Sequence, residues 1–462
     1  MPEPVVPPAG GRTTVRVGTR ASRLALTQTG MVADRLAAEG PLDTELVRIT
    51  TDGDRLTGSL VALGGTGVFV TALREALLDT RCDVAVHSLK DLPTGPSDGL
   101  VIAAVPERED PRDALCARDG MTLAELPVGA RVGTGSPRRA AQLRAARPDL
   151  AVVDIRGNVD TRLGRVAPGD LDAVVLARAG LARIGRLDAV TEVIEATTMA
   201  PAPGQGALAV EVRTADVGDA GTPLARALTA VDHLPTRLAV TAERSLLARL
   251  EAGCAAPIGA LAHLEHTGAA VRLVLDAVVC REDGTAQLRR TLAVALTTPR
   301  TDLSDPARSR ARATPDTPTV TPTVTPTVTV TDDVSDPARP RARATPDTPT
   351  VTDDVSDPAR PRARATPDTP TVTDDVSDPA RSRARATPDT PTVGVTVTVT
   401  DHVSDPARSG ARGTPDTSEG WDTPEGWDAS GLVRAAERLG VEMAELLLAA
   451  GAADLAQLGA AR

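Results

Sequence analysis

The sequence predicts an α/β protein of three folded domains interrupted by a long insertion, and three observations lead to this. Outside residues 301–427, short apolar runs alternate with segments of helical period, as is typical of α/β domains. A strand, turn and helix pattern near residue 14 recurs near residue 130, which predicts two similar lobes with a cleft between them. A proline-rich repeat then separates the third domain into two parts. The length of 462 residues agrees with about three domains.

The two lobes are expected to begin alike. Residues 14–19 (TVRVGT) and 130–134 (ARVGT) read as strands that end in a tight turn, and each leads into a helix opened by hydroxyl residues such as Ser22 and Ser136. Pro137 suits the first helical turn. Helix starts of this kind offer free N–H groups and a positive dipole end, so both lobes are expected to attract anions there.

The third domain is expected to begin near Asp232, where a helix to about Leu250 leads into strands at 271–279 and 291–296. An amphipathic helical pattern resumes over residues 430–461, so the insertion splits this domain rather than trailing from its end. The expected boundaries are 13–106 with 201–228 for the first lobe, 107–200 for the second lobe, 229–300 with 428–462 for the third domain, and 301–427 for the insertion.

Residues 301–427, rich in Pro, Thr, Asp and Arg, are predicted to be disordered. Nearly identical copies begin at Asp336, Asp357 and Asp378, 21 residues apart, and the segment holds 19 of the 38 prolines. A solenoid would need an apolar face on every copy, yet each copy offers only one or two valines, and proline interrupts helices and strand ladders. Disorder is therefore favoured, with a mucin-like or partner-binding tract as the lesser alternative.

Composition excludes several classes of protein. The net charge of −11 and the near absence of aromatic residues disfavour a nucleic-acid surface. No apolar run approaches the roughly 18 residues of a membrane span, and residues 1–11 lack the apolar core of a signal peptide, so a cytoplasmic location is predicted. No metal site is expected, because His263 and His266 have no other ligand type at suitable spacing. No Cys-x-x-Cys pair occurs among the four cysteines, Cys82, Cys116, Cys254 and Cys280.

The single lysine of the chain, Lys90, is the first candidate for chemistry. All other basic residues are arginines, and an ammonium differs from a guanidinium in hydration, reach and hydrogen-bond geometry. Asp91 follows it, at the end of an apolar strand over residues 84–86. In a cleft that neutralises anionic groups, a spared carboxylate can stabilise a developing cation or move protons. A plain surface pair or a helix cap is the alternative for Asp91.

Arginines gather at strand-to-helix junctions, the side of an α/β sheet where ligands bind. A guanidinium can clamp a carboxylate through two hydrogen bonds, so arginines at corresponding junctions of two lobes indicate a ligand with several carboxylates. Any one of them taken alone would be interpreted as a surface residue. The arginines at these junctions are Arg20, Arg23, Arg138, Arg139, Arg156 and Arg162.

Cys254 differs from the other three cysteines. It lies in residues 251–257 (EAGCAAP), just past a helix, among small residues that leave room for a bulky group on sulfur. This setting favours a covalent attachment point or a nucleophile, although an inert buried thiol is the more common role. Cys82, Cys116 and Cys280 fall beside or within apolar strand patterns and are predicted to be core residues.

Six segments in order carry a combined signal, and they are residues 87–93 (HSLKDLP), 108–113 (REDPRD), 133–139 (GTGSPRR), 156–158 (RGN), 203–207 (PGQGA) and the Cys254 loop. Together these segments resemble the hydroxymethylbilane synthase family, also called porphobilinogen deaminases, over residues 13–300 and 428–460. The resemblance implies a transferase with two periplasmic-binding-protein-like lobes, which joins four porphobilinogen molecules head to tail with loss of ammonia. It also implies that a covalently bound dipyrromethane primes the chain and that hydrolysis releases hydroxymethylbilane for tetrapyrrole (haem) biosynthesis.

The resemblance also implies residue roles. Asp91 matches the catalytic aspartate, which would stabilise the electron-poor azafulvenium formed when ammonia leaves, and Cys254 matches the thioether attachment site of dipyrromethane. The residues that would hold the cofactor are Lys90, Ser88, Thr134, Ser136, Arg138, Arg139 and Arg162. Those that would hold porphobilinogen or the growing chain are Arg20, Ser22, Arg156, Arg183 and Gln205.

One departure and one rival interpretation remain. Thr66 stands in residues 64–69 (GGTGVF) where the family often has lysine, so it receives no site role. A two-lobed architecture also serves solute-binding and effector-sensing proteins, and fold alone does not separate these from an enzyme. Such a binder needs no covalent anchor, so Cys254 discriminates between the two. A monomer without nucleic-acid or membrane partners is expected.

Overall fold

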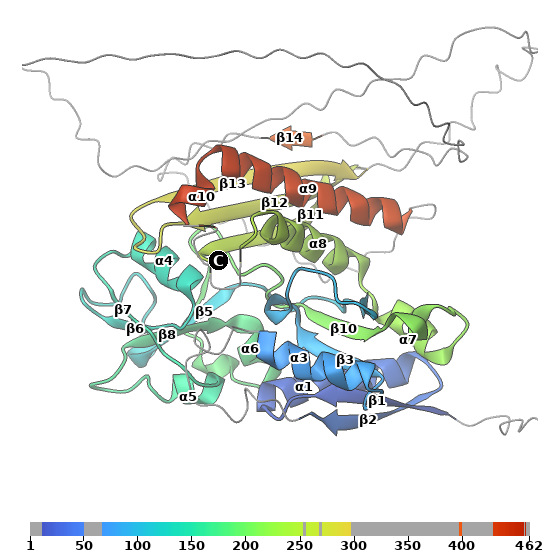
Figure 1. Ribbon diagram of the computed structural model, residues 1–462. Coiled ribbons are helices and arrows are strands. Elements are labelled where there is room, and N and C mark those ends of the chain that lie inside the picture. The colour runs from blue at the N-terminus through green and yellow to red at the C-terminus, as the bar shows by residue number, and fades with distance from the viewer. Residues whose placement is uncertain are drawn as a thin grey trace, which may run out of the picture. The chain divides into compact units, whose positions relative to one another are not determined.

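A computed structural model describes residues 12–49, 67–252, 256–267, 270–296, 397–399, 428–456 and 458. These residues form three sheets flanked by helices and belong to one compact unit (Figure 1). The predicted α/β class and the two similar lobes are confirmed by the strand orders given below. None of the helices in these ranges is both long and apolar enough to cross a membrane.

The first sheet has the strand order β2-β1-β3-β10-β4. Strands β1, β2 and β3 are parallel, and β10 runs antiparallel to both β3 and β4. Alternate residues of β3 face opposite sides, so Val84 packs under α1 and α7 while Ala85 packs under α3. The elements are β1 Thr13–Thr19, α1 Arg23–Glu39, β2 Leu42–Arg48, α3 Gly67–Leu78, β3 Val84–Ser88, β4 Leu100–Ala104, β10 Leu208–Arg213 and α7 Pro223–Val231.

The second sheet repeats this arrangement with the order β7-β6-β8-β5-β9. Strands β6, β7 and β8 are parallel, and β5 runs antiparallel to β8 and β9. The chain passes between the two sheets twice, over residues 105–112 and 195–207, which we call the crossover segments. The elements are β5 Asp113–Ala117, β6 Arg131–Gly133, α4 Pro137–Ala146, β7 Ala151–Val153, α5 Val159–Leu163, β8 Ala173–Ala177, α6 Arg178–Arg183 and β9 Glu192–Ile194.

The helix starts of the two lobes correspond, as predicted. Ser22 caps α1, where its Oγ accepts from the Ala25 N–H at 3.3 Å. Ser136 caps α4, where its Oγ accepts from the Arg139 N–H at 3.5 Å, and Pro137 occupies the first helical position. Each hydroxyl thus satisfies a backbone donor that a helix start leaves without a partner.

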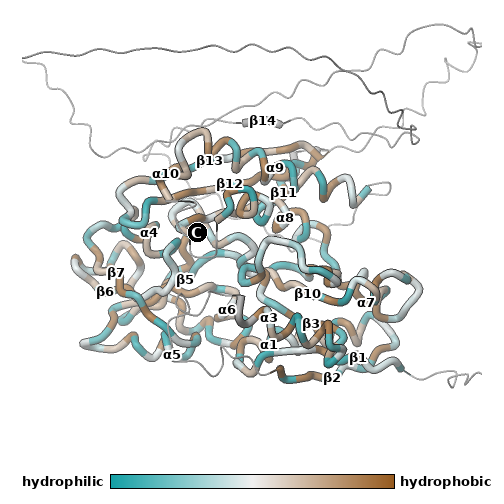
Figure 2. The backbone as a smooth tube through the Cα atoms, viewed as in Figure 1, coloured by the Kyte–Doolittle hydropathy of each residue, from teal (hydrophilic) through white to brown (hydrophobic). Residues whose placement is uncertain are grey.

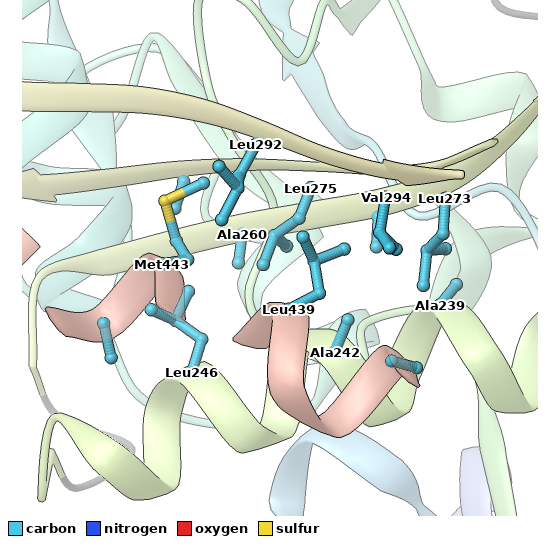
Figure 3. Packing of buried hydrophobic residues seen from close by; sticks show 14 of the residues in the cluster. Ala239, Ala242, Leu246, Ala260, Leu273, Leu275, Leu292, Val294, Leu439 and Met443 are labelled. Carbon is cyan, nitrogen blue, oxygen red and sulfur yellow. The ribbon is translucent and has the colours of Figure 1, made fainter. Parts of the chain in front are cut away.

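The third sheet is an antiparallel meander, and α8 and α9 pack on one of its faces (Figure 3). Leu246 of α8, Leu439 and Met443 of α9 and Leu275 and Leu292 of the sheet are all at most 1% exposed. Strands β12 and β13 carry runs of hydrophobic positions along this core (Figure 2). The elements are α8 Leu234–Arg249, β11 Ile258–Thr267, β12 Ala270–Cys280, β13 Gln287–Leu296, β14 Val397–Val399, α9 Ala429–Ala449 and α10 Ala452–Leu455.

Three expectations about this domain need correction. The helix expected over 430–461 ends at Ala449, because Gly451 has a φ of 91° and separates α9 from α10. Strand β11 was not expected at all. Residues 397–399 fall within the insertion that was expected to be disordered, yet they pair with β13 as β14, since an alternating Val-Thr sequence favours a strand. Residues 301–396 and 400–427 lie outside the described residues.

Candidate active site

A cavity of about 230 Å³ is lined by residues of both lobes. The first lobe contributes α1 and the end of β3, and the second lobe contributes α4, α5, α6 and the end of β8. Gly206 and Ala207, at the end of the second crossover segment, complete the lining. The cavity therefore brings together six of the predicted site residues, Ser88, Lys90, Asp91, Arg139, Arg162 and Arg183.

Strand β3 delivers the first-lobe side chains to the cavity. It ends in a 3₁₀ turn, η1 (Leu89–Asp91), in which Leu89 is 1% exposed and its N–H donates to the Ala207 carbonyl at 3.0 Å. With Leu89 anchored, its neighbours Ser88, Lys90 and Asp91 line the cavity. Asp91 is also exposed, so it borders both the cavity and solvent. The Ser88 hydroxyl donates to Gln28 Oε1 of α1 at 3.1 Å.

The lining carries more positive than negative charge. Four of its side chains are cationic, Lys90, Arg139, Arg162 and Arg183, and one is a carboxylate, Asp91. Burial lowers the pKa of Lys90 to about 8, although the Asp91 carboxylate opposes this change. Burial likewise lowers the pKa of Arg183 to about 10, and Glu109 opposes it. Burial also lowers the pKa of Arg162, and Arg139 and Arg156 add to this effect. The cavity is thus suited to an anion.

Asp113, which the sequence interpretation did not assign to the site, is buried beside the cavity and pairs with two of the predicted arginines. Its Oδ1 accepts from Arg139 Nη2 at 2.8 Å, and its Oδ2 lies 2.8 Å from Arg138 Nη1. Burial alone would raise the pKa of Asp113, but Arg138 and Arg139 lower it well below the usual range. A carboxylate that opens the otherwise apolar strand β5 was the signal in the sequence.

Gln205 connects this buried cluster to Lys90. Its Nε2 donates to Asp113 Oδ1 at 2.8 Å and to the Pro111 carbonyl at 2.6 Å. Its Oε1 accepts from Lys90 Nζ and Arg139 Nη2, both at 3.4 Å. Gln205 is 1% exposed and lies outside the cavity lining, and its predicted contact with substrate stays a prediction.

The glycine after Gln205 is required where the crossover segments meet. Gly206 has a φ of 89°, and a Cβ there would collide with the Glu109 carbonyl oxygen. The Gly206 carbonyl accepts from the Glu109 N–H at 3.3 Å and from Arg183 Nη2 at 2.6 Å. This close approach allows Arg183 of the second lobe to reach the second crossover segment.

Six other predicted residues do not line the cavity. Arg138 is 3% exposed and engaged with Asp113 and the Ala200 carbonyl. Arg156 is exposed, and its Nη2 lies 3.2 Å from Asp154 Oδ2. The remaining four residues follow β1 or β6, and they are Arg20, Ser22, Thr134 and Ser136. Ser22 and Ser136 cap helices, and Thr134 Oγ1 accepts from the Ser136 N–H at 3.2 Å.

Of the four cysteines, only Cys254 lies outside the described residues, as does Thr66. Cys82, Cys116 and Cys280 are free and buried, which confirms them as core residues. Burial raises the pKa of each of these thiols to about 11, so they are inert at neutral pH. The attachment role of Cys254 therefore stays a prediction.

Comparison with known proteins gives consistent matches. The family model "Porphobilinogen deaminase, dipyromethane cofactor binding domain" matches residues 15–218, and "Porphobilinogen deaminase, C-terminal domain" matches residues 237–304. The chain is similar to porphobilinogen deaminase of Leifsonia xyli subsp. xyli, with 62% identity over 274 residues, 59% of this chain and 82% of that protein. It is also similar to the Thermobifida fusca protein of the same name, with 60% identity over 285 residues, 62% of this chain and 87% of that protein.

A solved structure resembles part of the chain more distantly. Immunogenic lipoprotein A from Vibrio vulnificus is 15% identical and covers 47% of this chain and 94% of its own, with a TM-score of 0.29.

Proposed function

We infer that the cavity is the active site of a hydroxymethylbilane synthase, because the chain belongs to the porphobilinogen deaminase family. The enzyme is a transferase of tetrapyrrole (haem) biosynthesis. It joins four porphobilinogen molecules head to tail, loses ammonia at each step, and releases hydroxymethylbilane by hydrolysis. The rival function, solute binding or effector sensing by two lobes, is not favoured, because the matching family model describes a dipyrromethane cofactor domain.

The observation that carries the site assignment is the excess of cations around the cavity. Each pyrrole unit carries an acetate and a propionate, so a dipyrromethane brings four carboxylates. Lys90, Arg139, Arg162 and Arg183 supply four cations among the lining residues, and Asp113, shared between Arg138 and Arg139, offsets only part of this charge. The Nε of Arg183 is buried and has no acceptor among the described residues, which a ligand carboxylate would provide. The residues present therefore fit the cofactor.

The bound dipyrromethane supplies a nucleophilic pyrrole carbon for chain growth. Asp91 would stabilise the positive charge that develops on porphobilinogen as ammonia leaves, and would accept the proton that the attacked ring loses. Lys90, Arg139 and Arg162 would hold cofactor carboxylates, and Arg183 would hold a carboxylate of the incoming or growing chain. Asp113 and Gln205 would position Arg139 and Lys90 for these contacts through the hydrogen bonds given above.

Cys254 is proposed as the thioether attachment residue. Its segment joins α8 to β11, and Ala252 and Ala256 on either side pack against the core of the third domain. The predicted domain boundaries, including 229–300 with 428–462 as the cofactor-attachment domain, belong to the same proposal. A monomeric state and a cytoplasmic location also belong to it, and the three free thiols of the described cysteines are consistent with the reducing conditions of the cytoplasm.

The test of the proposal combines a catalytic and a covalent measurement. Asp91→Asn should retain a protein mass raised by two pyrrole units and a colour reaction with Ehrlich's aldehyde reagent. Its turnover of porphobilinogen should fall by about a hundredfold or more, because a carboxamide neither stabilises a cation nor accepts a proton. Asp98→Asn, an exposed carboxylate outside the cavity lining, is the matched control. Normal turnover by Asp91→Asn would refute the assignment of Asp91.

A further inference from the structure

Arg244 contacts the backbone on both sides of Asp91. It lies on α8, and its Nη1 donates to the Leu92 carbonyl at 3.0 Å and to the Leu89 carbonyl at 3.3 Å. Its Nη2 donates to the Pro93 carbonyl at 2.7 Å. Leu89 and Leu92 flank Lys90 and Asp91, and we call η1 the catalytic turn because it carries Asp91. One rigid, planar guanidinium thus holds three acceptors at once, which a flexible ammonium does less well.

The catalytic turn has few backbone bonds of its own. η1 contains three residues, and its closing bond runs from the Leu92 N–H to the Leu89 carbonyl at 3.1 Å. Short 3₁₀ turns have poor hydrogen-bond geometry, so their position depends on what surrounds them. The side chains of Leu89 and Leu92 are buried against Val240, which lies one helical turn before Arg244. Helix α8 therefore supports the turn through both apolar packing and hydrogen bonds.

The same helix leads directly to the proposed attachment residue. α8 ends at Arg249, and Cys254 follows five residues later. Arg244 lies about 7.5 Å along the axis from this end, at about 1.5 Å per residue. The backbone that carries Asp91 and the start of the segment that carries Cys254 are therefore both connected to one rigid element of the third domain.

We propose that Arg244 is a positioning residue, which fixes the turn bearing Asp91 relative to α8 and so aligns the carboxylate with the chain that grows from Cys254. The inference rests on the proposed function and deepens it, since it gives the third domain a part in catalysis beyond attachment. Arg244 acts on Asp91 through the backbone of residues 89–93.

Arg237, another arginine of α8, is a control that distinguishes positioning of the catalytic turn from general attachment of the helix to the first lobe. Arg237 Nη2 donates to the Ala103 carbonyl at 2.9 Å, and its Nε donates to Asp232 Oδ2 at 2.7 Å. It thus joins α8 to the same lobe at β4, away from Asp91. If these arginines served only to hold the helix in place, removal of either would have the same effect on catalysis.

Loss of the Arg244 guanidinium should affect geometry more than stability. Arg244, Pro93 and Arg237 border a second cavity of about 480 Å³, from which water can reach the carbonyls that lose their donor. Water would satisfy these acceptors without holding them in one position. The expected loss is therefore in kcat, with little change in KM or in attachment of the cofactor.

The experiment compares Arg244→Met, Arg244→Lys and Arg237→Met in the full chain. Arg244→Met should keep the mass raised by two pyrrole units and a KM within about twofold. Its kcat should fall by about ten- to a hundredfold, since a displacement of about 1 Å can cost about a hundredfold in rate. Arg244→Lys should recover part of this loss, and Arg237→Met should stay within about twofold of the unsubstituted chain. Hydrogen exchange over residues 87–98 should accelerate in Arg244→Met alone.

The outcomes separate the two proposals. Absence of porphobilinogen turnover by the unsubstituted chain overturns the proposed function itself. An active unsubstituted chain together with a normal kcat in Arg244→Met overturns only the positioning role. An equal loss of kcat in Arg237→Met also overturns it, because the effect would then belong to the attachment of α8 in general.

Discussion

Replacing Asp113 by asparagine tests the buried charge cluster beside the cavity. Asp113 is fully buried and faces the guanidinium groups of Arg138 and Arg139, which are 3% and 5% exposed. Removal of one partner from a buried charge cluster costs about 3–5 kcal/mol, because the remaining charges lose their compensation. This is a large part of a typical stability of about 5–15 kcal/mol. The loss of unfolding free energy should be largest in a Cys254→Ser background without cofactor, since no ligand carboxylate then offsets the charges of Arg138 and Arg139.

The pH dependence follows from the lowered pKa of Asp113. Because the pKa in the folded state lies below that in the unfolded chain, the carboxylate stabilises the fold above about pH 4, and this contribution is lost as the pH falls through the folded pKa. The difference in unfolding free energy between the parent and Asp113→Asn should therefore be constant from about pH 5 to 8.

Urea unfolding followed by far-UV circular dichroism measures this difference. Intrinsic fluorescence is unsuitable for the core, because both tryptophans, Trp421 and Trp427, lie at the end of the insertion. Asp170→Asn is the matched control, since Asp170 pairs with Arg165 at the surface with 38% of its side chain exposed, and such pairs contribute about 0–1 kcal/mol. A loss in Asp113→Asn no larger than in this control would refute the reasoning.

Three further predictions concern Lys90, Cys254 and the insertion. The pKa of Lys90 is lowered from 10.5 to about 8 in the fold, so the charged ammonium destabilises the fold until it loses its proton. In the Cys254→Ser background, the free energy of unfolding of the parent should therefore rise relative to that of Lys90→Met by at most about 3 kcal/mol between about pH 8 and 10. A difference between the two proteins that does not change with pH would contradict burial of the ammonium. Cys254→Ser should have no mass increment of two pyrrole units, and retention of that increment excludes Cys254 as the attachment residue. Deletion of residues 305–390 should leave turnover within about twofold, because this insertion is remote in sequence from the site residues and surface loops tolerate insertions and deletions. Deletion of 305–399 should also lower the unfolding midpoint by exposing the edge of β13, and equal midpoints for the two deletions would exclude a contribution from β14.

Some features of the site could be predicted because their signals are local. Residues 84–91 contain an apolar strand, its end and two charged residues in immediate succession, so the placement of Lys90 and Asp91 after β3 follows from a few neighbouring residues. The helix starts at Ser22 and Ser136 were equally predictable, since an N-cap hydrogen bond spans only three residues.

Other features depended on contacts between distant segments. Arg138 and Arg139 are adjacent in sequence, yet Arg139 lines the cavity while Arg138 is buried against Asp113 and the Ala200 carbonyl. Gln205 connects Lys90 to Asp113, 115 and 92 residues away along the chain, which the sequence did not predict. No pattern in one segment reveals such partners, because they come together only when the crossover segments pass side by side.

The sequence by itself determined the α/β class, the duplicated lobes, the split third domain and the residue types of a polyanion site, because hydrophobic period, helix caps and motif order are properties of short stretches of chain. The tertiary structure alone decided which cations face the cavity and which are neutralised within the protein. It also revealed that α8 of the third domain holds the turn of Asp91 through Arg244. The physical reason is that burial and charge compensation depend on atoms brought together from distant parts of the chain.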